Sequence, residues 1–179
     1  MPITVGGGVR TESDAIKLFS NGADKISINS AAVRNPNIIN LLYKKIGSQS
    51  LVILIEAKKI SENKWEVYTE NGREKSGIDV FEWIKKVVQL GAGEIIITSI
   101  DKEGTMRGPD YKLAEKSSKI STVPILYCGG IGDMQDIINL VNISNIDGVV
   151  LASLLHYDKI NVQEIKRKLK KFKKVRIDY

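Results

Sequence analysis

The stretch Glu94–Gly108 combines a strand pattern with side chains that can perform acid–base chemistry or bind a ligand. After Glu94 come three consecutive isoleucines, 95–97, a β-branched run typical of a strand covered on both faces in a parallel sheet. Hydroxyls, charged groups and a glycine follow at the carboxyl end of that strand: Thr98, Ser99, Asp101, Lys102, Glu103, Gly104 and Thr105. In α/β proteins ligands bind at this end of the strands. A solvated loop is the alternative interpretation, but several other strands of the chain end in the same way.

Two kinds of strand end repeat within the chain. Val5–Val9 resembles Tyr127–Ile131, and Lys25–Ala32 resembles Gly148–Leu155, so a glycine-rich end is followed one unit later by a small polar end in each half. Glycine lets a phosphate approach bare backbone N–H groups, and a nearby helix N-terminus favours an anion. The repeat predicts two phosphate sites on one rim, although glycine-rich turns also occur for purely geometric reasons.

The elements that position these residues alternate between strand and helix, which predicts an α/β fold with a parallel sheet and right-handed crossovers. No linker divides the chain, so we expect one domain, 1–179. The predicted strands are 3–5, 25–28, 51–55 (which delivers Glu56 to its carboxyl end), 95–97, 124–127 and 147–151. The predicted helices are 11–19 and 80–90, with Thr11 and Asp79 as N-caps, and 36–45, 111–120, 134–141 and 162–172. Residues 58–60 and 65–69 are predicted to form a β-hairpin excursion that ends at Asn71-Gly72.

Composition limits the classes of protein to consider. The lone Cys128 excludes an internal disulfide, and no segment has the pattern of a signal peptide or a membrane span, so a cytoplasmic protein without a membrane partner is expected. The net charge is +6, and basic residues crowd the last predicted helix: Lys166, Arg167, Lys168, Lys170, Lys171, Lys173, Lys174 and Arg176. No aromatic platform accompanies them, so a solvated face is expected rather than nucleic-acid binding.

Several motifs, taken in order, resemble those of HisF, the cyclase subunit of imidazole glycerol phosphate synthase. They are Val5–Arg10, Gly22–Asn29, Gly47–Gln49, Gly91–Ile95, Thr98–Thr105 and His156-Tyr157, and the resemblance covers essentially the whole chain. It implies the (β/α)8 TIM-barrel fold, which needs about 250 residues. This chain has 179 and begins at what resembles the third strand of the family. We therefore expect an incomplete barrel of about six βα units, the third to the eighth, with two exposed strand edges.

The resemblance also implies an activity in histidine biosynthesis. Ammonia released from glutamine by a partner glutaminase, HisH, passes through the barrel and reacts with an aminoimidazole ribonucleotide precursor that carries a phosphate at each end. The products are imidazole glycerol phosphate and a purine by-product. No cofactor and no metal are implied.

The resemblance assigns roles to individual residues. Glu56 and Glu103 match acidic catalytic positions. One phosphate is assigned to Gly8, Asn29 and Ser30, the other to Gly104, Gly129, Gly130, Ala152 and Ser153, and Thr98 with Ser99 lines the same mouth. At the barrel bottom Lys25 and Glu94 match a charged gate for ammonia, and Asp24 matches a position that faces the glutaminase. A stabilising ion pair is the alternative for Lys25 and Glu94.

Residue 56 departs from the cyclases of the histidine pathway, which have aspartate there. Catalytic geometry is sensitive to the displacement that one extra methylene produces. Glutamate at this position resembles HisF paralogues of surface-polysaccharide clusters, which are thought to conduct ammonia from a HisH-like glutaminase to a sugar amidotransferase that makes acetamidino groups. The conduit function and an inactive fragment are therefore the alternatives to a cyclase.

A turnover assay of the purified chain tests the expectation that the first two βα units of the family are missing. The family's second essential carboxylate lies on its first strand, so we expect no cyclase turnover with added ammonium salt. Imidazole glycerol phosphate formation, followed chromatographically, would refute this expectation if it exceeded the rate without protein.

Overall fold

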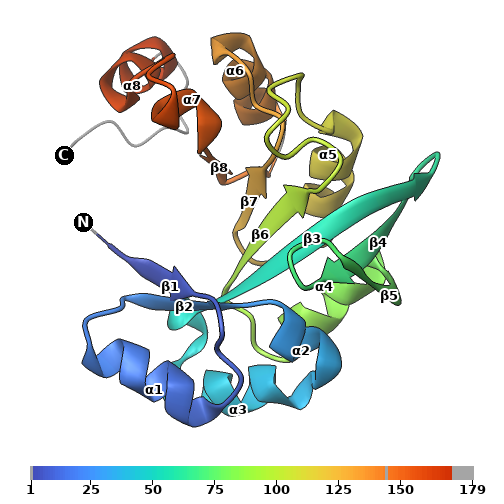
Figure 1. The fold of residues 1–179 in the computed structure, drawn as a ribbon, viewed down its shortest axis with the longest axis vertical. Helices are drawn as coiled ribbons and strands as arrows, with labels where there is room; N and C mark the ends of the chain where they lie inside the picture. The colour runs from blue at the N-terminus through green and yellow to red at the C-terminus, as the bar shows by residue number, and fades with distance from the viewer. Residues whose placement is uncertain (1, 144, 171–179) are drawn as a thin grey trace.

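Six parallel strands, each followed by one or two helices, form the sheet that the alternating sequence predicts. The computed structural model describes residues 2–143 and 145–170, and within them the parallel strands lie in the order β1-β2-β3-β6-β7-β8 (Figure 1). Every neighbouring pair in this order is parallel. The strands are β1 (Thr4–Gly6), β2 (Lys25–Ile28), β3 (Leu51–Ser61), β6 (Glu94–Ser99), β7 (Ile125–Cys128) and β8 (Gly148–Val150).

Several of the described helices begin at a side-chain cap, whereas α2, α3 and α7 have none. Thr11 and Asp14 form a reciprocal capping box at the start of α1, and the Asp79 carboxylate accepts hydrogen bonds from the first backbone N–H groups of α4, so both predicted N-caps are confirmed. The helices are α1 (Glu12–Ser20), α2 (Ser30–Arg34), α3 (Asn37–Ile46), α4 (Val80–Gln89), α5 (Tyr111–Ile120), α6 (Met134–Asn142), α7 (Ser153–His156) and α8 (Val162–Leu169), with a short 3₁₀ turn at Ser48–Ser50.

The core lies between the sheet and the helices. Alternate strand residues point to the helices and are buried, because successive side chains of a strand point to opposite faces. Contacts of α1 with β2, α3 with β3, α5 with β7 and α6 with β8 cover this outer face. Its fully buried side chains include Ile26, Ile53, Ile55, Ile95, Ile97 and Tyr127.

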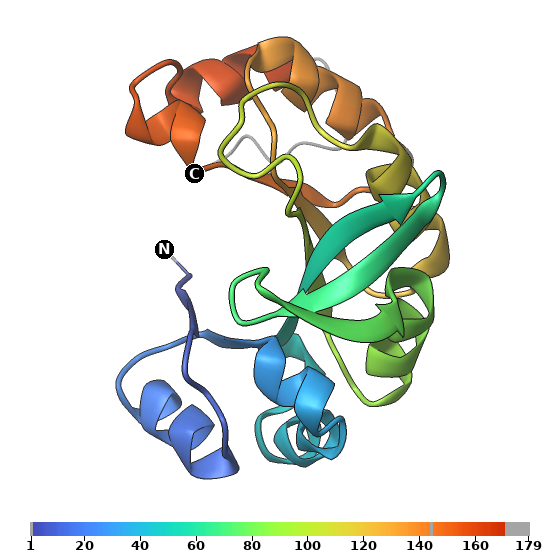
Figure 2. The ribbon, with the colours of Figure 1, turned by 45° about the vertical axis from the view of Figure 1, so that its right-hand side comes forward.

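The sheet curves into an open half-ring with the helices on its outside (Figure 2). Within the described ranges β1 pairs with β2 alone and β8 with β7 alone, so the two ends of the parallel sheet are not joined to each other. This architecture confirms the predicted incomplete (β/α)8 barrel. All six carboxyl ends lie on the same rim, as parallel pairing requires.

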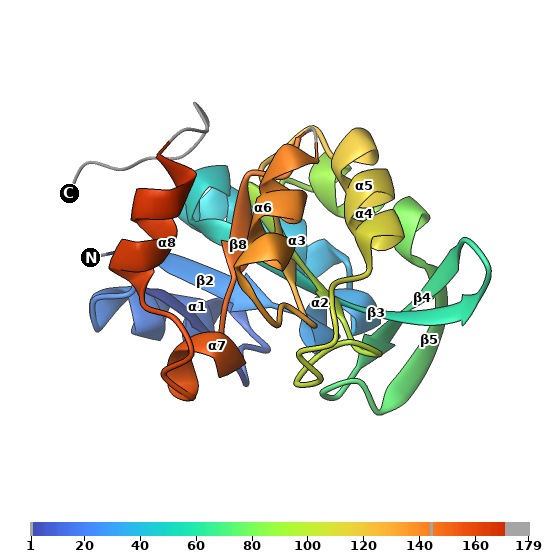
Figure 3. The same ribbon diagram turned by 90° about the horizontal axis from the view of Figure 1, so that it is seen from above.

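The antiparallel pairing of residues 56–61 with 64–68 confirms the predicted hairpin, but its bounds are wrong in two respects. Strand β3 runs without interruption to Ser61, and the excursion continues past Asn71-Gly72 into a further strand, β5 (Glu74–Asp79), antiparallel to β4 (Lys64–Thr69). Figure 3 shows the β3, β4 and β5 ribbons projecting from one end of the molecule. Strand β5 could not be predicted because its sequence lacks alternation of apolar and polar residues. Its residues are largely exposed and include a glycine at 77.

The short helices α2 and α7 were not predicted, for a related reason. Helix α2 has five residues and α7 has four, and neither is long enough to display a 3.6-residue apolar period. Both start directly after a small polar strand end, at Ser30 and at Ser153.

The last predicted helix, 162–172, has its start confirmed by α8 at Val162, but α8 ends at Leu169 and Lys170 follows in a turn. Residues 171–179 lie outside the described part, and with them Phe172, Lys171, Lys173, Lys174 and Arg176. Among the described helices, none combines the length and the apolar character that crossing a bilayer requires.

A buried polar network ties the excursion to the rest of the rim. The Trp65 indole Nε1 donates to Asp110 Oδ2 at 2.8 Å, and the Asp110 backbone N–H donates to the Tyr127 hydroxyl at 2.7 Å. Asp110 also caps α5 through Leu113 N. Burial raises the pKa of Tyr127, so its hydroxyl keeps its proton. The network fixes β4 against the loop that follows β6.

Candidate functional site at the carboxyl rim

The inner face of the half-ring is polar at both ends and apolar between them. Strand register places Glu56, Thr98 and Cys128 side by side near the carboxyl ends, and Leu54, Ile96 and Leu126 one layer below. Because alternation keeps Lys25, Ser27, Val52 and Glu94 on the same face, the ion pair of Lys25 and Glu94 lies at the opposite end. One curved surface thus joins two polar regions through an apolar band.

Glu56 occupies the point where β3 changes neighbour. On one edge β3 pairs with β2 up to Ile53 and with β4 from Glu56 onward, while β6 pairs along the other edge from Val52 to Ala57. The Glu56 Oε2 atom accepts two hydrogen bonds in this opening, from Asn29 Nδ2 at 2.8 Å and from the Gly72 backbone N–H at 3.1 Å. One carboxylate oxygen is therefore held by two donors.

Burial is the main reason that the pKa of Glu56 lies above its ordinary value. The nearby charges of Glu103 and Glu70 raise it further, and the hydrogen bonds from Gly72 and Asn29 oppose the increase. A carboxyl group with a raised pKa holds its proton closer to neutral pH and suits a general acid or base.

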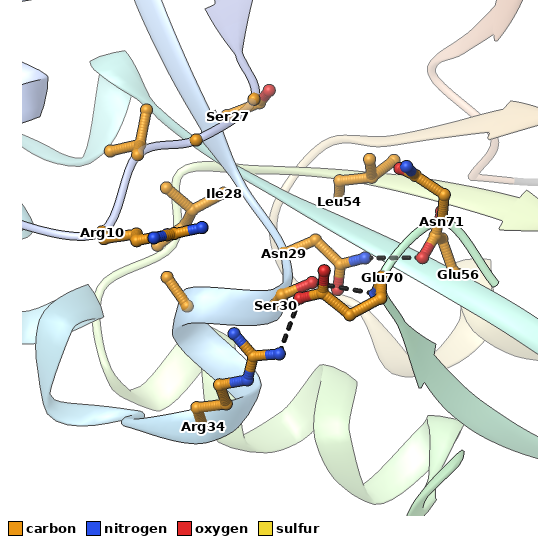
Figure 4. A pocket seen from close by; sticks show the side chains of 14 residues that line it. Arg10, Ser27, Ile28, Asn29, Ser30, Arg34, Leu54, Glu56, Glu70 and Asn71 are labelled. Carbon is orange, nitrogen blue, oxygen red and sulfur yellow. Dashed lines mark hydrogen bonds and ion pairs between the residues drawn. The ribbon is translucent and has the colours of Figure 1, made fainter. Parts of the chain in front are cut away.

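Glu56 shares a pocket of about 290 Å³ with the first predicted phosphate residues, which we call the first rim pocket (Figure 4). Gly8, Asn29 and Ser30 line it together with Glu56. Gly7 and Gly8 have φ of 97° and 71°, and a Cβ atom on either would meet nothing within 4 Å. The backbone conformation requires glycine here, and the space beside it is open to a ligand. The structure thus brings these predicted residues together.

Asn29 offers one further group to a ligand in this pocket. Its Oδ1 atom is buried and has no hydrogen-bond partner among the described residues. An unsatisfied buried acceptor is costly, so a ligand donor or an ordered water is the expected partner.

The other predicted phosphate residues line a second rim pocket of about 230 Å³. They are Gly104, Gly129, Gly130, Ala152 and Ser153, joined by Glu103. Gly130 also serves packing, because a Cβ there would approach the Gly108 carbonyl oxygen to 2.4 Å, and the Gly108 N–H donates to Gly130 O at 2.8 Å. The geometric interpretation of a glycine-rich turn therefore applies to this pocket in addition to the ligand interpretation.

Thr98 and Ser99 line neither rim pocket. Thr98 lies on the inner face beside Glu56, nearly buried. Ser99 is fully buried and opposite Ala57, on the face that meets the helices. The Ser99 carbonyl accepts hydrogen bonds from Lys102 N and Glu103 N, so this residue shapes the turn that carries Glu103.

The residues predicted for the ammonia gate form a contact at the amino ends of the strands. Lys25 Nζ lies 2.6 Å from Glu94 Oε2, and the two side chains reach each other across β3. Asp24 makes a different contact: its Oδ2 accepts a hydrogen bond from Ile3 N at 2.7 Å. The contact is compatible with both a gate and a stabilising ion pair.

Sequence reasoning missed several polar residues of the first rim pocket. Arg10, Arg34, Glu70 and Asn71 also line it. Arg10 directly follows the glycine-rich strand end, so its position in the motif was an available signal. Arg34 and Glu70 meet only through the fold, and no local pattern marks them. In residues 2–143 and 145–170, no three cysteine, histidine, aspartate or glutamate side chains cluster as metal ligands.

Glu56→Gln tests the raised pKa of this carboxyl group. The Gln oxygen can accept both hydrogen bonds that Oε2 accepts, so the contacts are kept. A carboxyl with a raised folded pKa gives its full contribution to stability below its ordinary value of 4.5, and that contribution is lost as the pH rises through the folded pKa. We expect wild type to lose stability relative to Glu56→Gln across that window, as measured by urea denaturation at a series of pH values. A difference that is independent of pH contradicts the assignment.

Comparison with known proteins agrees with this geometry. Residues 1–161 match the family model described as "Histidine biosynthesis protein". Two relatives, each named imidazole glycerol phosphate synthase subunit HisF, come from Bacillus cereus strains G9842 and Q1. Each is 45% identical to this chain over 170 residues, which cover 95% of this chain and 68% of the relative. The chain therefore belongs to the histidine biosynthesis protein family and, within it, to the HisF group.

Proposed function

We propose that this chain carries the reaction rim of an imidazole glycerol phosphate synthase cyclase subunit, a lyase of histidine biosynthesis in the cytoplasm. The observation that carries the proposal is the position of Glu56, a half-buried carboxyl with a raised pKa inside a pocket whose glycine backbone is open to an anion. The HisF relatives name the activity. Glu56 would exchange a proton with the ammonia-derived intermediate, and the two donors on Oε2 would leave Oε1 to face it.

Two pockets on one rim suit a substrate with a phosphate at each end. Gly7 and Gly8 bound the first rim pocket, and Gly104, which has φ of 70° and open space around it, bounds the second. Binding both phosphates holds the central part of such a substrate over the inner face, where Glu56 lies. Fixing a reactant in this way removes translational and rotational freedom that the reaction otherwise has to lose.

The inner face also supports a route for ammonia from a HisH-like glutaminase. The Lys25–Glu94 pair lies at the amino ends of the strands, and Leu54, Ile96 and Leu126 line the way to Glu56. An apolar band admits neutral ammonia more readily than ammonium, because burying an isolated charge is costly. We propose that the glutaminase docks at the end that carries Lys25 and Asp24, forming a heterodimer.

Gly8→Ala tests the phosphate assignment with a matched control. Gly8 lines the first rim pocket, whereas Gly22, which also has positive φ (97°) and no atom within 4 Å of a Cβ, lines neither rim pocket. Each substitution should cost about 1 kcal/mol of stability. We expect Gly8→Ala to weaken binding of the two-phosphate precursor by about tenfold or more, about 1.4 kcal/mol or more in binding free energy. Gly22→Ala should leave the affinity unchanged in isothermal titration calorimetry.

Equal affinities of the two variants would contradict the phosphate assignment. If wild type binds no two-phosphate precursor but raises the activity of a HisH-like glutaminase, the conduit function is favoured over the cyclase.

A further inference from the structure

The turn that joins β4 to β5 is left-handed over three successive residues. Glu70, Asn71 and Gly72 have φ of 52°, 58° and 74°, and the Arg73 N–H donates to the Thr69 carbonyl oxygen at 3.0 Å. A left-handed conformation is unfavourable for most residues other than glycine, although asparagine tolerates it. Of the three residues, Glu70 has neither the freedom of glycine nor the tolerance of asparagine, so it needs contacts from outside the turn.

Helix α2 supplies those contacts. The Glu70 N–H donates to Ser30 Oγ at 3.0 Å, and Arg34 Nη2 lies 2.7 Å from Glu70 Oε1. Glu74 Oε2 adds a longer contact of 3.7 Å to the same guanidinium nitrogen. Figure 4 shows Arg34 and Glu70 meeting at the edge of the first rim pocket. Ser30 and Arg34 thus bind the first residue of the left-handed turn from one side.

The last residue of the left-handed turn contacts the candidate catalytic carboxyl. The Gly72 N–H donates to Glu56 Oε2, and a Cβ on Gly72 would already touch the Ile100 side chain at 3.3 Å. A shift of the turn therefore changes the hydrogen bonding of Glu56. The chain of contacts runs from Arg34 through Glu70 and Gly72 to Glu56.

We propose that Arg34 and Glu70 are positioning residues for Glu56: their ion pair holds the left-handed turn so that the Gly72 N–H stays on the carboxylate. The significance for catalysis rests on the proposed function, because it assumes that Glu56 exchanges protons with substrate. Both side chains are about half exposed, at 56% and 43%, and such pairs add little to global stability. Their effect is local, on the conformation of one turn.

Two accounts of Glu70 predict opposite effects on the pKa of Glu56. The charged groups that bear on Glu56 are Glu103 and Glu70, which raise its pKa, and Arg10 and Arg34 also line the pocket. If Glu70 acts only through its charge, Glu70→Ala lowers the pKa of Glu56. If Glu70 holds the turn, the substitution loosens the Gly72 hydrogen bond and raises the pKa. The Gly72 bond has the larger influence of the two, so the positioning account expects an increase.

Nuclear magnetic resonance of protein labelled with ¹³C at the glutamate carboxyls measures this directly, with Glu56→Gln assigning the signal. We expect a higher Glu56 pKa in both Arg34→Ala and Glu70→Ala. Exchange of the Gly72 amide hydrogen should become about fivefold faster or more. Lys85→Ala is the control, since it removes another exposed ion pair, with Glu82 on α4, and should change neither quantity. The charge-swapped double variant R34E/E70R should restore slow Gly72 exchange.

A lower Glu56 pKa in Glu70→Ala, with Gly72 exchange unchanged, would overturn the proposal. So would a double variant that exchanges as fast as the single variants. Neither measurement needs turnover or a bound substrate. Failure to bind the two-phosphate precursor would therefore contradict the proposed function and leave the positioning of Glu56 standing. Unchanged Gly72 exchange in the Arg34 and Glu70 variants of a protein that binds the precursor would contradict the positioning and leave the proposed function standing.

Discussion

The rest of the rim depends on the exchange of partners along one edge of β3. Strand β2 ends at Ile28, and β4 begins to pair with β3 at Glu56, so the backbone opens between them while β6 pairs along the other edge. A side chain at that opening lies where one neighbouring strand ends and the next begins, yet it is not fully exposed to solvent. Asn29, at the end of β2, and Gly72, beyond the end of β4, reach it from the two strands that meet there. The site is thus a consequence of sheet topology.

Burial of a carboxyl group in this opening requires compensation. A half-buried carboxyl group without partners would remain protonated, and a carboxylate with strong cationic partners would lose basicity. Burial raises the proton affinity of Glu56, and two nearby carboxylates raise it further, while two neutral donors on one oxygen oppose the increase and fix the orientation of the carboxyl group. The arrangement places a proton-exchanging group beside open glycine backbone, the combination on which the proposed reaction depends.

Much of this fold could be predicted from the sequence because its signals are local. The strand 25–28 and the helix 111–120 have the predicted bounds, and the caps at Thr11 and Asp79 hold as predicted, since apolar periods and capping side chains act over a few residues. Strand β5 and the pairing of Arg34 with Glu70 could not be predicted, because they depend on partners far away in the sequence. The orientation of Thr98 and Ser99 could not be predicted either, because the sequence alone does not show which of two adjacent hydroxyl side chains faces inward.

The two glycine-rich ends look alike in sequence, and the structure separates their physical roles. Gly8 borders open space, whereas Gly130 lets the loop after β6 approach closely. A crystal structure of the protein with the two-phosphate precursor tests the central claim most directly. The account predicts one phosphate in each rim pocket and the central part of the ligand within hydrogen-bonding distance of Glu56 Oε1. A ligand that occupies neither pocket, or that binds in both without approaching Glu56, would contradict it.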